Sequence, residues 1–265
     1  MTFTIAIAGK GGTGKTTLAG LLIDLLRQSG AVPVLAIDAD PASNLDAVLN
    51  MPLERTVGDI REDTSEKARS GRLEAGIAKQ DVLDYEINAS IVEGEGVDLL
   101  AMGRPEGPGC YCAANNMLRV IIDRISASYE YVVIDNEAGL EHLSRRTTRD
   151  VDVLLIVSDA SMRGLTTAGR IVELIAELKT DIGRHYLIVN RAAGPLTPQA
   201  ELAVKAYGLN LLAILRADSE IADLDAAGQP IIDLRSTNPV YESMRSVLTE
   251  ILPEVRKEKL RADHR

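Results

Sequence analysis

The chain has 265 residues, of which 46% are hydrophobic and 26% charged, a composition typical of a soluble protein and long enough for one large domain. Its formal net charge of −10 argues against a protein whose affinity comes from neutralising a nucleic-acid backbone, so we expect no nucleic-acid partner. No apolar run approaches the roughly 18 residues that span a bilayer, and the chain starts with a strand pattern rather than a signal peptide. We therefore expect a cytoplasmic protein without a membrane partner.

The first elements predict a strand–helix–strand unit. Residues 2–8 alternate and are rich in β-branched side chains, which indicates a strand, and residues 16–29 carry leucines at helical spacing. Gly30 follows where helices commonly end, and residues 34–38 predict a second buried strand. Such units pair their strands in parallel with right-handed crossovers, so we expect an α/β fold with a mostly parallel sheet flanked by helices.

The rest of the chain continues this alternation. Residues 51–90 are polar and weakly periodic, and we expect short helices there, in an excursion over the ligand site rather than in the core. Further strands are expected over 97–102, 131–135, 151–158, 185–190 and 210–215, and further helices over 113–128, 163–179, 198–206 and 238–252. No linker or repeat interrupts the chain, which predicts a single domain over 1–265 with a charged tail around 254–265.

A phosphate-binding motif lies between the first strand and the first helix. GKGGTGKT, residues 9–16, matches G-x-x-x-x-G-K-[ST] in the context that the motif requires, which predicts a P-loop NTPase fold. Glycines let backbone N–H groups point at phosphate oxygens, Lys15 would reach the β- and γ-phosphates, and the Thr16 hydroxyl would coordinate Mg²⁺. We expect ATP to be bound by Gly9, Gly11, Gly12, Thr13, Gly14, Lys15, Thr16 and Thr17.

Two acidic residues fit the same chemistry. Asp135 ends a hydrophobic strand, the position from which a carboxylate holds Mg²⁺ in this class of protein. Asp40 lies in DADPASN just after the second strand, where it can orient the attacking water for displacement at the γ-phosphate. The alternative for Asp40 is a turn or helix-cap residue before Pro41.

The chain has two cysteines, Cys110 and Cys112, separated by one residue. A disulfide across this spacing would be strained and is uncommon in a reducing cytoplasm. Two such thiolates can instead bind a soft metal ion, and the two-fold axis of a dimer would supply two more, giving a four-sulfur site. Four thiolates suit tetrahedral Zn²⁺ as well as planar Ni²⁺. The alternative is a pair of buried, inert cysteines.

The phosphate motif and three further segments carry a family resemblance. GKGGTGKTT resembles the deviant Walker A motif of the MinD/ParA group of P-loop ATPases, to which the nitrogenase iron protein also belongs. DADPASN is similar to that group's first switch, YVVIDNEAG to its Walker B strand and second switch, and VNR at 189–191 to its adenine-side loop. The resemblance places Asn190 and Arg191 beside adenine, where an amide such as that of Asn190 can both donate and accept hydrogen bonds.

The same resemblance assigns a role to Lys10, which phosphate binding itself does not require. It implies a homodimer in which Lys10 reaches the phosphates of the partner's nucleotide, so that ATP hydrolysis depends on dimerisation. This is the device of an arginine finger, a cation supplied on assembly where charge develops in the transition state. The alternative is a surface lysine without a function. The catalytic residues expected are thus Lys10, Lys15 and Asp40.

The cysteine segment narrows the resemblance further. GPGCYCAANN and DNEAGLEHLSRR, together with the deviant Walker A motif, resemble the CooC-type ATPases that mature nickel enzymes. This resemblance implies an ATP-dependent homodimer that delivers Ni²⁺, bound by Cys110 and Cys112, to a carbon monoxide dehydrogenase apoenzyme. No role is assigned to Glu137 or His142.

Two other classes of protein remain as alternatives. One is an iron–sulfur ATP-dependent reductase like the nitrogenase iron protein, although the two cysteines of that protein lie far apart in sequence. The other is a MinD/ParA-like positioning ATPase, which the acidic charge of this chain disfavours.

Overall fold

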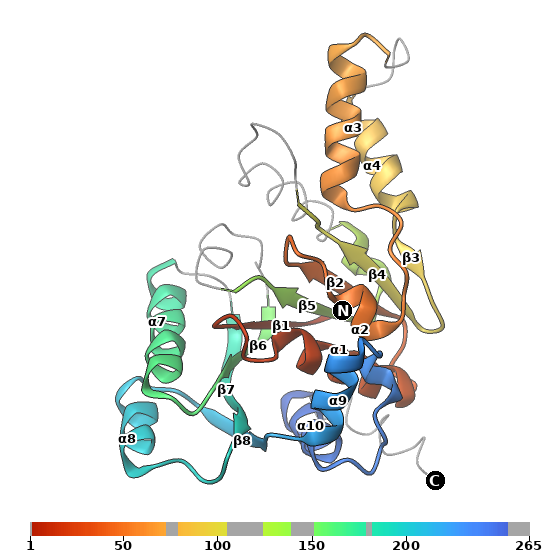
Figure 1. Cartoon of the computed structure of the whole chain (residues 1–265). Coiled ribbons are helices and arrows are strands. Elements are labelled where there is room, and N and C mark those ends of the chain that lie inside the picture. The colour runs from red at the N-terminus through yellow and green to blue at the C-terminus, as the bar shows by residue number, and fades with distance from the viewer. Residues whose placement is uncertain (1, 73–78, 105–123, 139–150, 179–181, 254–265) are drawn as a thin grey trace.

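The computed structural model describes residues 2–72, 79–104, 124–138, 151–178 and 182–253. Within them lies one eight-stranded sheet in the order β3-β4-β2-β5-β1-β6-β7-β8, with helices on both faces (Figure 1). The strands are β1 (Phe3–Gly9), β2 (Val34–Ala39), β3 (Val92–Glu93), β4 (Val97–Ala101), β5 (Tyr131–Asn136), β6 (Val151–Ser158), β7 (Ile182–Ala192) and β8 (Leu211–Arg216). All neighbouring strands pair in parallel except β3 and β4, which confirms the predicted fold class.

The described helices cover the sheet in two layers. Their bounds are α1 (Lys15–Gln28), α2 (Leu45–Leu49), α3 (Val57–Arg69), α4 (Lys79–Ala89), α7 (Met162–Leu178), α8 (Pro198–Ala206), α9 (Ser219–Ala227) and α10 (Pro239–Ile251). The apolar side chains of α1 and α10 pack on one face of the sheet, and those of α3, α4, α7 and α8 on the other. The central strand β1 serves both layers, because Ile5 and Ile7 face the first layer and Ala6 and Ala8 the second.

The expectation that residues 51–90 lie outside the core was wrong. Short helices do form there, α3 and α4, and Figure 1 shows them side by side, projecting beyond the sheet. However, Val57, Ile60, Leu83 and Ile87 are buried and belong to the second core layer. Their spacing of three and four residues is helical, but the charged residues between them obscured this pattern.

Other differences are small. The sequence did not predict three short elements: the five-residue helix α2, the nine-residue helix α9 and the two-residue strand β3. Residue Gly30, predicted at a helix end, has a φ of 70°, as expected just after α1. Most of the helix predicted over 113–128 and the whole tail around 254–265 lie outside the described residues. In the described part of the chain, no helix is both long and apolar enough to cross a membrane.

Candidate functional site

The phosphate loop connects the end of β1 to the start of α1 at the carboxyl edge of the sheet, where all its predicted residues are described. Two of its glycines are required by close approaches. At Gly9, whose φ is 152°, a Cβ atom would lie 2.1 Å from the carbonyl oxygen of Val157. At Gly14, with φ 88°, a Cβ atom would lie 2.6 Å from Asn190 Nδ2. Only glycine fits at both positions, and this steric restriction explains why the motif has glycine there.

The polar side chains of the loop are ordered by internal contacts. Thr13 is buried, and its hydroxyl donates to the carbonyl oxygen of Lys10 at 2.8 Å. Lys15, at the first position of α1, is 7% exposed. It lies close enough to Asp135 to favour the ionised form of that carboxyl. The loop therefore places an ammonium and the N-terminus of a long helix beside a buried acid.

Asp135 has the environment of a metal-binding carboxylate. It ends β5, is 1% exposed, and its Oδ1 atom is buried without a hydrogen-bond partner. Burial raises the pKa of Asp135 to about 7, with Asp38 and Asp40 adding to the increase, while a hydrogen bond from the Thr16 hydroxyl and the charge of Lys15 oppose it. An unsatisfied carboxylate oxygen next to a hydroxyl is the donor set that Mg²⁺ prefers, so Thr16 and Asp135 fit this ion.

Asp38 is a residue of the site that the sequence interpretation missed. It pairs in register with Asp135 on the neighbouring strand β5, and both side chains face α1. Its carboxylate accepts the backbone N–H groups of Asp40 at 3.0 Å and of Asn44 and Leu45 at 2.9 Å. Burial raises the pKa of Asp38 to about 6, and the charge of Asp40 adds to the increase, although these three hydrogen bonds favour the ionised form. Asp38 thus organises the loop after β2.

Asp40, the predicted water-orienting residue, lies on this loop. Its Oδ1 atom accepts the backbone N–H of Ala42 at 2.9 Å, which is the turn role given as the alternative in the sequence. The Asp40 side chain is partly exposed. The catalytic role of Asp40 stays a prediction.

Lys10 forms a surface ion pair with Asp159, beyond the end of β6. Its Nζ atom lies 3.7 Å from Asp159 Oδ2, and the two side chains are 44% and 40% exposed. Asp159 follows the end of β6. Burial raises the pKa of its carboxyl, but hydrogen bonds from Ser161 and the charge of Lys10 outweigh this and lower it. A lysine at the surface beside the phosphate loop suits the predicted action on a partner's nucleotide, which no contact in this single chain tests.

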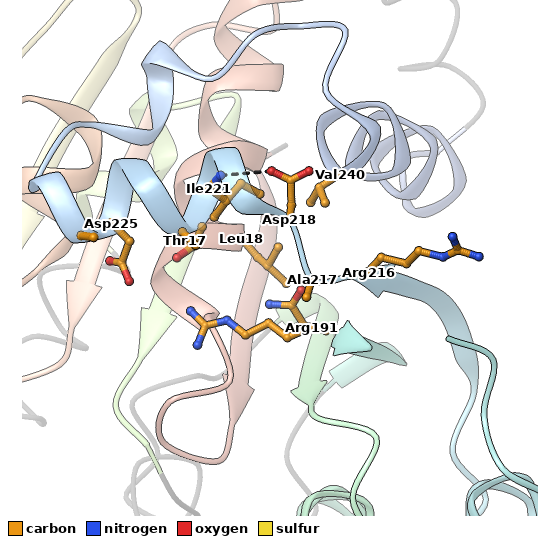
Figure 2. Close-up of a pocket in the computed structure, with 12 residues that line it drawn as sticks. Thr17, Leu18, Arg191, Arg216, Ala217, Asp218, Ile221, Asp225 and Val240 are labelled. Carbon is orange, nitrogen blue, oxygen red and sulfur yellow. Dashed lines mark hydrogen bonds between the residues drawn. The ribbon is translucent and has the colours of Figure 1, made fainter. Parts of the chain in front are cut away.

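Asn190 and Arg191, at the end of β7, border a cavity of 310 Å³ next to the phosphate loop (Figure 2). Figure 2 shows the cavity between α9 and the end of β7, with Thr17 of α1 on its wall. Asp218 caps α9 by accepting the N–H of Ile221 at 3.1 Å, the dashed line in the figure. Apolar and polar groups both line this space, as in a nucleoside pocket. The polar lining residues beyond α1 are Asn190, Arg191, Arg216, Asp218 and Asp225.

Cys110 and Cys112, the predicted ligands of the transition metal, lie outside the described residues. His142 lies outside them as well. Among the residues that are described, no group of three or more His, Cys, Asp or Glu side chains could hold a metal ion. The expected Ni²⁺ or Zn²⁺ ligation is therefore a matter of the sequence alone.

A glycine loop leading into a helix, a lysine at the helix start and a magnesium-competent carboxylate on a neighbouring strand define a P-loop nucleoside triphosphatase. Residues 4–231 match the family described as the CobQ/CobB/MinD/ParA nucleotide binding domain, and the chain belongs to this family. The protein is thus an ATP-binding and ATP-hydrolysing enzyme, as the sequence predicted.

Two relatives cover nearly the whole chain. An uncharacterized ATP-binding protein of Methanocaldococcus jannaschii is 45% identical over 248 residues, which are 94% of this chain and 98% of the relative. The carbon monoxide dehydrogenase accessory protein CooC of Rhodospirillum rubrum is 34% identical over 241 residues, which are 87% of this chain and 89% of the relative.

The fold is also that of solved structures in the family. The septum site-determining protein MinD of Pyrococcus horikoshii, solved with Mg-ADP, has a TM-score of 0.70 at 21% identity, with coverage of 98% of this chain and 99% of that one. A ParA family ATPase from Chlorobium tepidum has the same TM-score at 19% identity, covering 93% and 98%.

Proposed function

We propose that this ATPase is a metallochaperone that couples ATP hydrolysis to the insertion of nickel into carbon monoxide dehydrogenase. The observation that carries the proposal is the 34% identity to the accessory protein CooC along 87% of this chain and 89% of that relative. The adjacent thiols Cys110 and Cys112 add the ligand chemistry that a carrier of a soft metal ion needs.

The nucleotide half of the proposal rests on the phosphate loop. Lys15 binds the β- and γ-phosphates, and the Thr16 hydroxyl and Asp135 hold Mg²⁺, whose charge offsets that of the phosphates. The backbone of Asp40 is fixed by its hydrogen bond to Asp38, so that its carboxylate orients the attacking water. The base is bound in the cavity between α9 and the end of β7, with Thr17 of α1 on its wall.

The metal half of the proposal requires two copies of the chain. Each subunit contributes Cys110 and Cys112, and four thiolates around a two-fold axis hold one nickel ion as cargo. Lys10 of each subunit stabilises the phosphates in the other, which makes hydrolysis depend on the closed dimer. ATP then changes metal affinity only as far as the open and closed dimers differ in affinity for ATP, and metal changes ATP affinity by the same factor.

Metal analysis of the purified protein tests this function. The expected result is one nickel ion per two chains, lost in Cys110→Ala and in Cys112→Ala, with MgATP and the nickel-loaded protein together activating nickel-free carbon monoxide dehydrogenase. A Lys15→Ala variant, which keeps both thiols, should hold the metal but fail to activate. Zinc alone in the thiol site, without activation, would refute the nickel role. A brown preparation containing iron and sulfide would favour the reductase alternative.

A further inference from the structure

The phosphate loop is held from outside by the end of β7. Asn190 Nδ2 donates to the carbonyl oxygen of Thr13 at 2.9 Å, and Arg191 Nη1 donates to the carbonyl oxygen of Gly12 at 3.2 Å. Neither bond is local, since each joins residues more than a hundred positions apart in sequence. Asn190 is 7% exposed, so water competes little for its contact with the loop.

These bonds orient the amides of the loop as well as its carbonyls. In a trans peptide the C=O and N–H groups point in opposite directions. The carbonyl of Gly12 shares its peptide plane with the N–H of Thr13, and the carbonyl of Thr13 shares its plane with the N–H of Gly14. When both carbonyls are directed toward β7, both N–H groups are turned to the opposite side of the loop. Successive N–H groups facing one side form the anion-binding arrangement that phosphates need.

Local backbone geometry agrees with a built contact. Arg191 has a φ of 54°, an uncommon conformation for a residue other than glycine. Gly14 packs so closely on this pair that a Cβ atom there would lie 2.6 Å from Asn190 Nδ2 and 3.8 Å from Arg191 Nε. A glycine of the phosphate motif is thus required partly because Asn190 occupies the space beside it.

We propose that Asn190 and Arg191 are positioning residues of the phosphate loop, which fix two of its carbonyls so that the amides of Thr13 and Gly14 face the phosphates. This differs from the adenine-side role that the family resemblance implies, because positioning serves every nucleoside triphosphate equally. The inference rests on ATP binding at the phosphate loop and not on the nickel site, so the metal experiments above can fail without affecting it.

The experiment compares two nucleotides with different bases in Asn190→Ala and Arg191→Ala. The measured quantity is kcat/KM for the hydrolysis of ATP and of UTP. Each variant should lose about tenfold with both nucleotides, as expected for one hydrogen bond that orients a binding group, and the ATP to UTP ratio should stay within about twofold of the wild type. An Arg191→Lys variant, which keeps a donor and a charge, should recover part of the loss.

The far half of β7 offers matched controls. Asn210 Nδ2 donates to the carbonyl oxygen of His185 at 3.2 Å, and Arg184 donates through Nη2 to the carbonyl oxygen of Ile251. Asn210→Ala and Arg184→Ala therefore remove the same kinds of side-chain-to-carbonyl bond away from the phosphate loop. Both should leave kcat/KM for ATP and UTP unchanged.

Two results would overturn the proposal. One is a loss with ATP but not with UTP, which would make Asn190 and Arg191 readers of the base. The other is an unchanged kcat/KM with both nucleotides. Thermal unfolding of each variant without nucleotide separates positioning from a loss of folded protein. Arg191 is exposed, so Arg191→Ala keeps the test decisive even if the buried Asn190 does not tolerate substitution.

Discussion

Replacing Asp135 with asparagine should stabilise the nucleotide-free protein at neutral pH. The carboxyl is 1% exposed, and burial raises its pKa to about 7 from the usual aspartate value of 3.8. Between these values the folded state binds more protons than the unfolded state, so the free energy of unfolding falls as the pH rises through this window. Asparagine has nearly the same shape but does not titrate. The predicted gain for Asp135→Asn is about 1 kcal/mol at pH 4.5 and about 4 kcal/mol at pH 7.5.

Chemical denaturation without nucleotide and with a metal chelator, repeated from pH 4.5 to 8, measures this difference. The matched control is Asp223→Asn, which removes an exposed carboxylate from α9 and should change the free energy of unfolding by less than about 0.5 kcal/mol at any pH. The reasoning would be refuted if Asp135→Asn were less stable than the wild type at pH 7.5, or if its advantage were the same at pH 4.5. The same variant should lose Mg²⁺-dependent ATP hydrolysis, so that stability and activity change in opposite directions.

Three further outcomes are expected. Lys10→Ala should lower kcat for ATP hydrolysis about 10³-fold. Mixing this variant with Asp40→Ala subunits should restore part of the activity, because one of the two sites in a mixed dimer then has both residues. A mixture that stays inactive would contradict the action of Lys10 on the partner's nucleotide. Asn238→Ala should lower the free energy of unfolding by about 2 kcal/mol in chemical denaturation. This buried amide caps α10 and also donates to the carboxylates of Asp218 and Glu220. A change under about 0.5 kcal/mol would show that the cap is dispensable. Tyr241→Phe should lower the free energy of unfolding by about 1 to 2 kcal/mol in the same assay. The reason is that the Tyr241 hydroxyl donates to the fully buried carboxylate of Asp24 at 3.0 Å. An unchanged denaturation midpoint would mean that the other hydrogen bonds of Asp24 suffice.

The centre of the sheet could be predicted because its strands are buried on both faces. β2, β5 and β6 are runs of apolar residues in which one or two polar residues lie at or next to an end, and such runs indicate central parallel strands without further context. α9 was missed although its ends carry ordinary signals, Asp218 as N-cap and Gly228 in a left-handed conformation after the last turn. Its middle lacks a clear apolar face, and none of its residues is buried, so periodicity gave nothing to detect.

The site divides along similar lines. The phosphate loop is a contiguous motif, and its residues were predicted because their spacing is local. Asp38 was missed because its role depends on register, the pairing of β2 with β5 that sets it beside Asp135. The bonds from Asn190 and Arg191 to the loop depend on the order of β1, β6 and β7 in the sheet, which no local pattern contains. Contacts of this kind follow from the tertiary fold and not from motif spacing.

The ion pair of Lys10 bears on how readily a lone subunit can engage a second one. Lys10 and Asp159 are both about two-fifths exposed, and their charged atoms lie 3.7 Å apart, so the pair contributes less than about 1 kcal/mol. In the proposed dimer, a partner's triphosphate, which has more charge than one carboxylate and less water around it after assembly, would attract the ammonium more strongly. The ion pair with Asp159 is therefore too weak to fix the position of the Lys10 side chain. When the proposed dimer forms, Lys10 can therefore leave Asp159 and bind the phosphates of the other subunit's nucleotide at little cost in free energy.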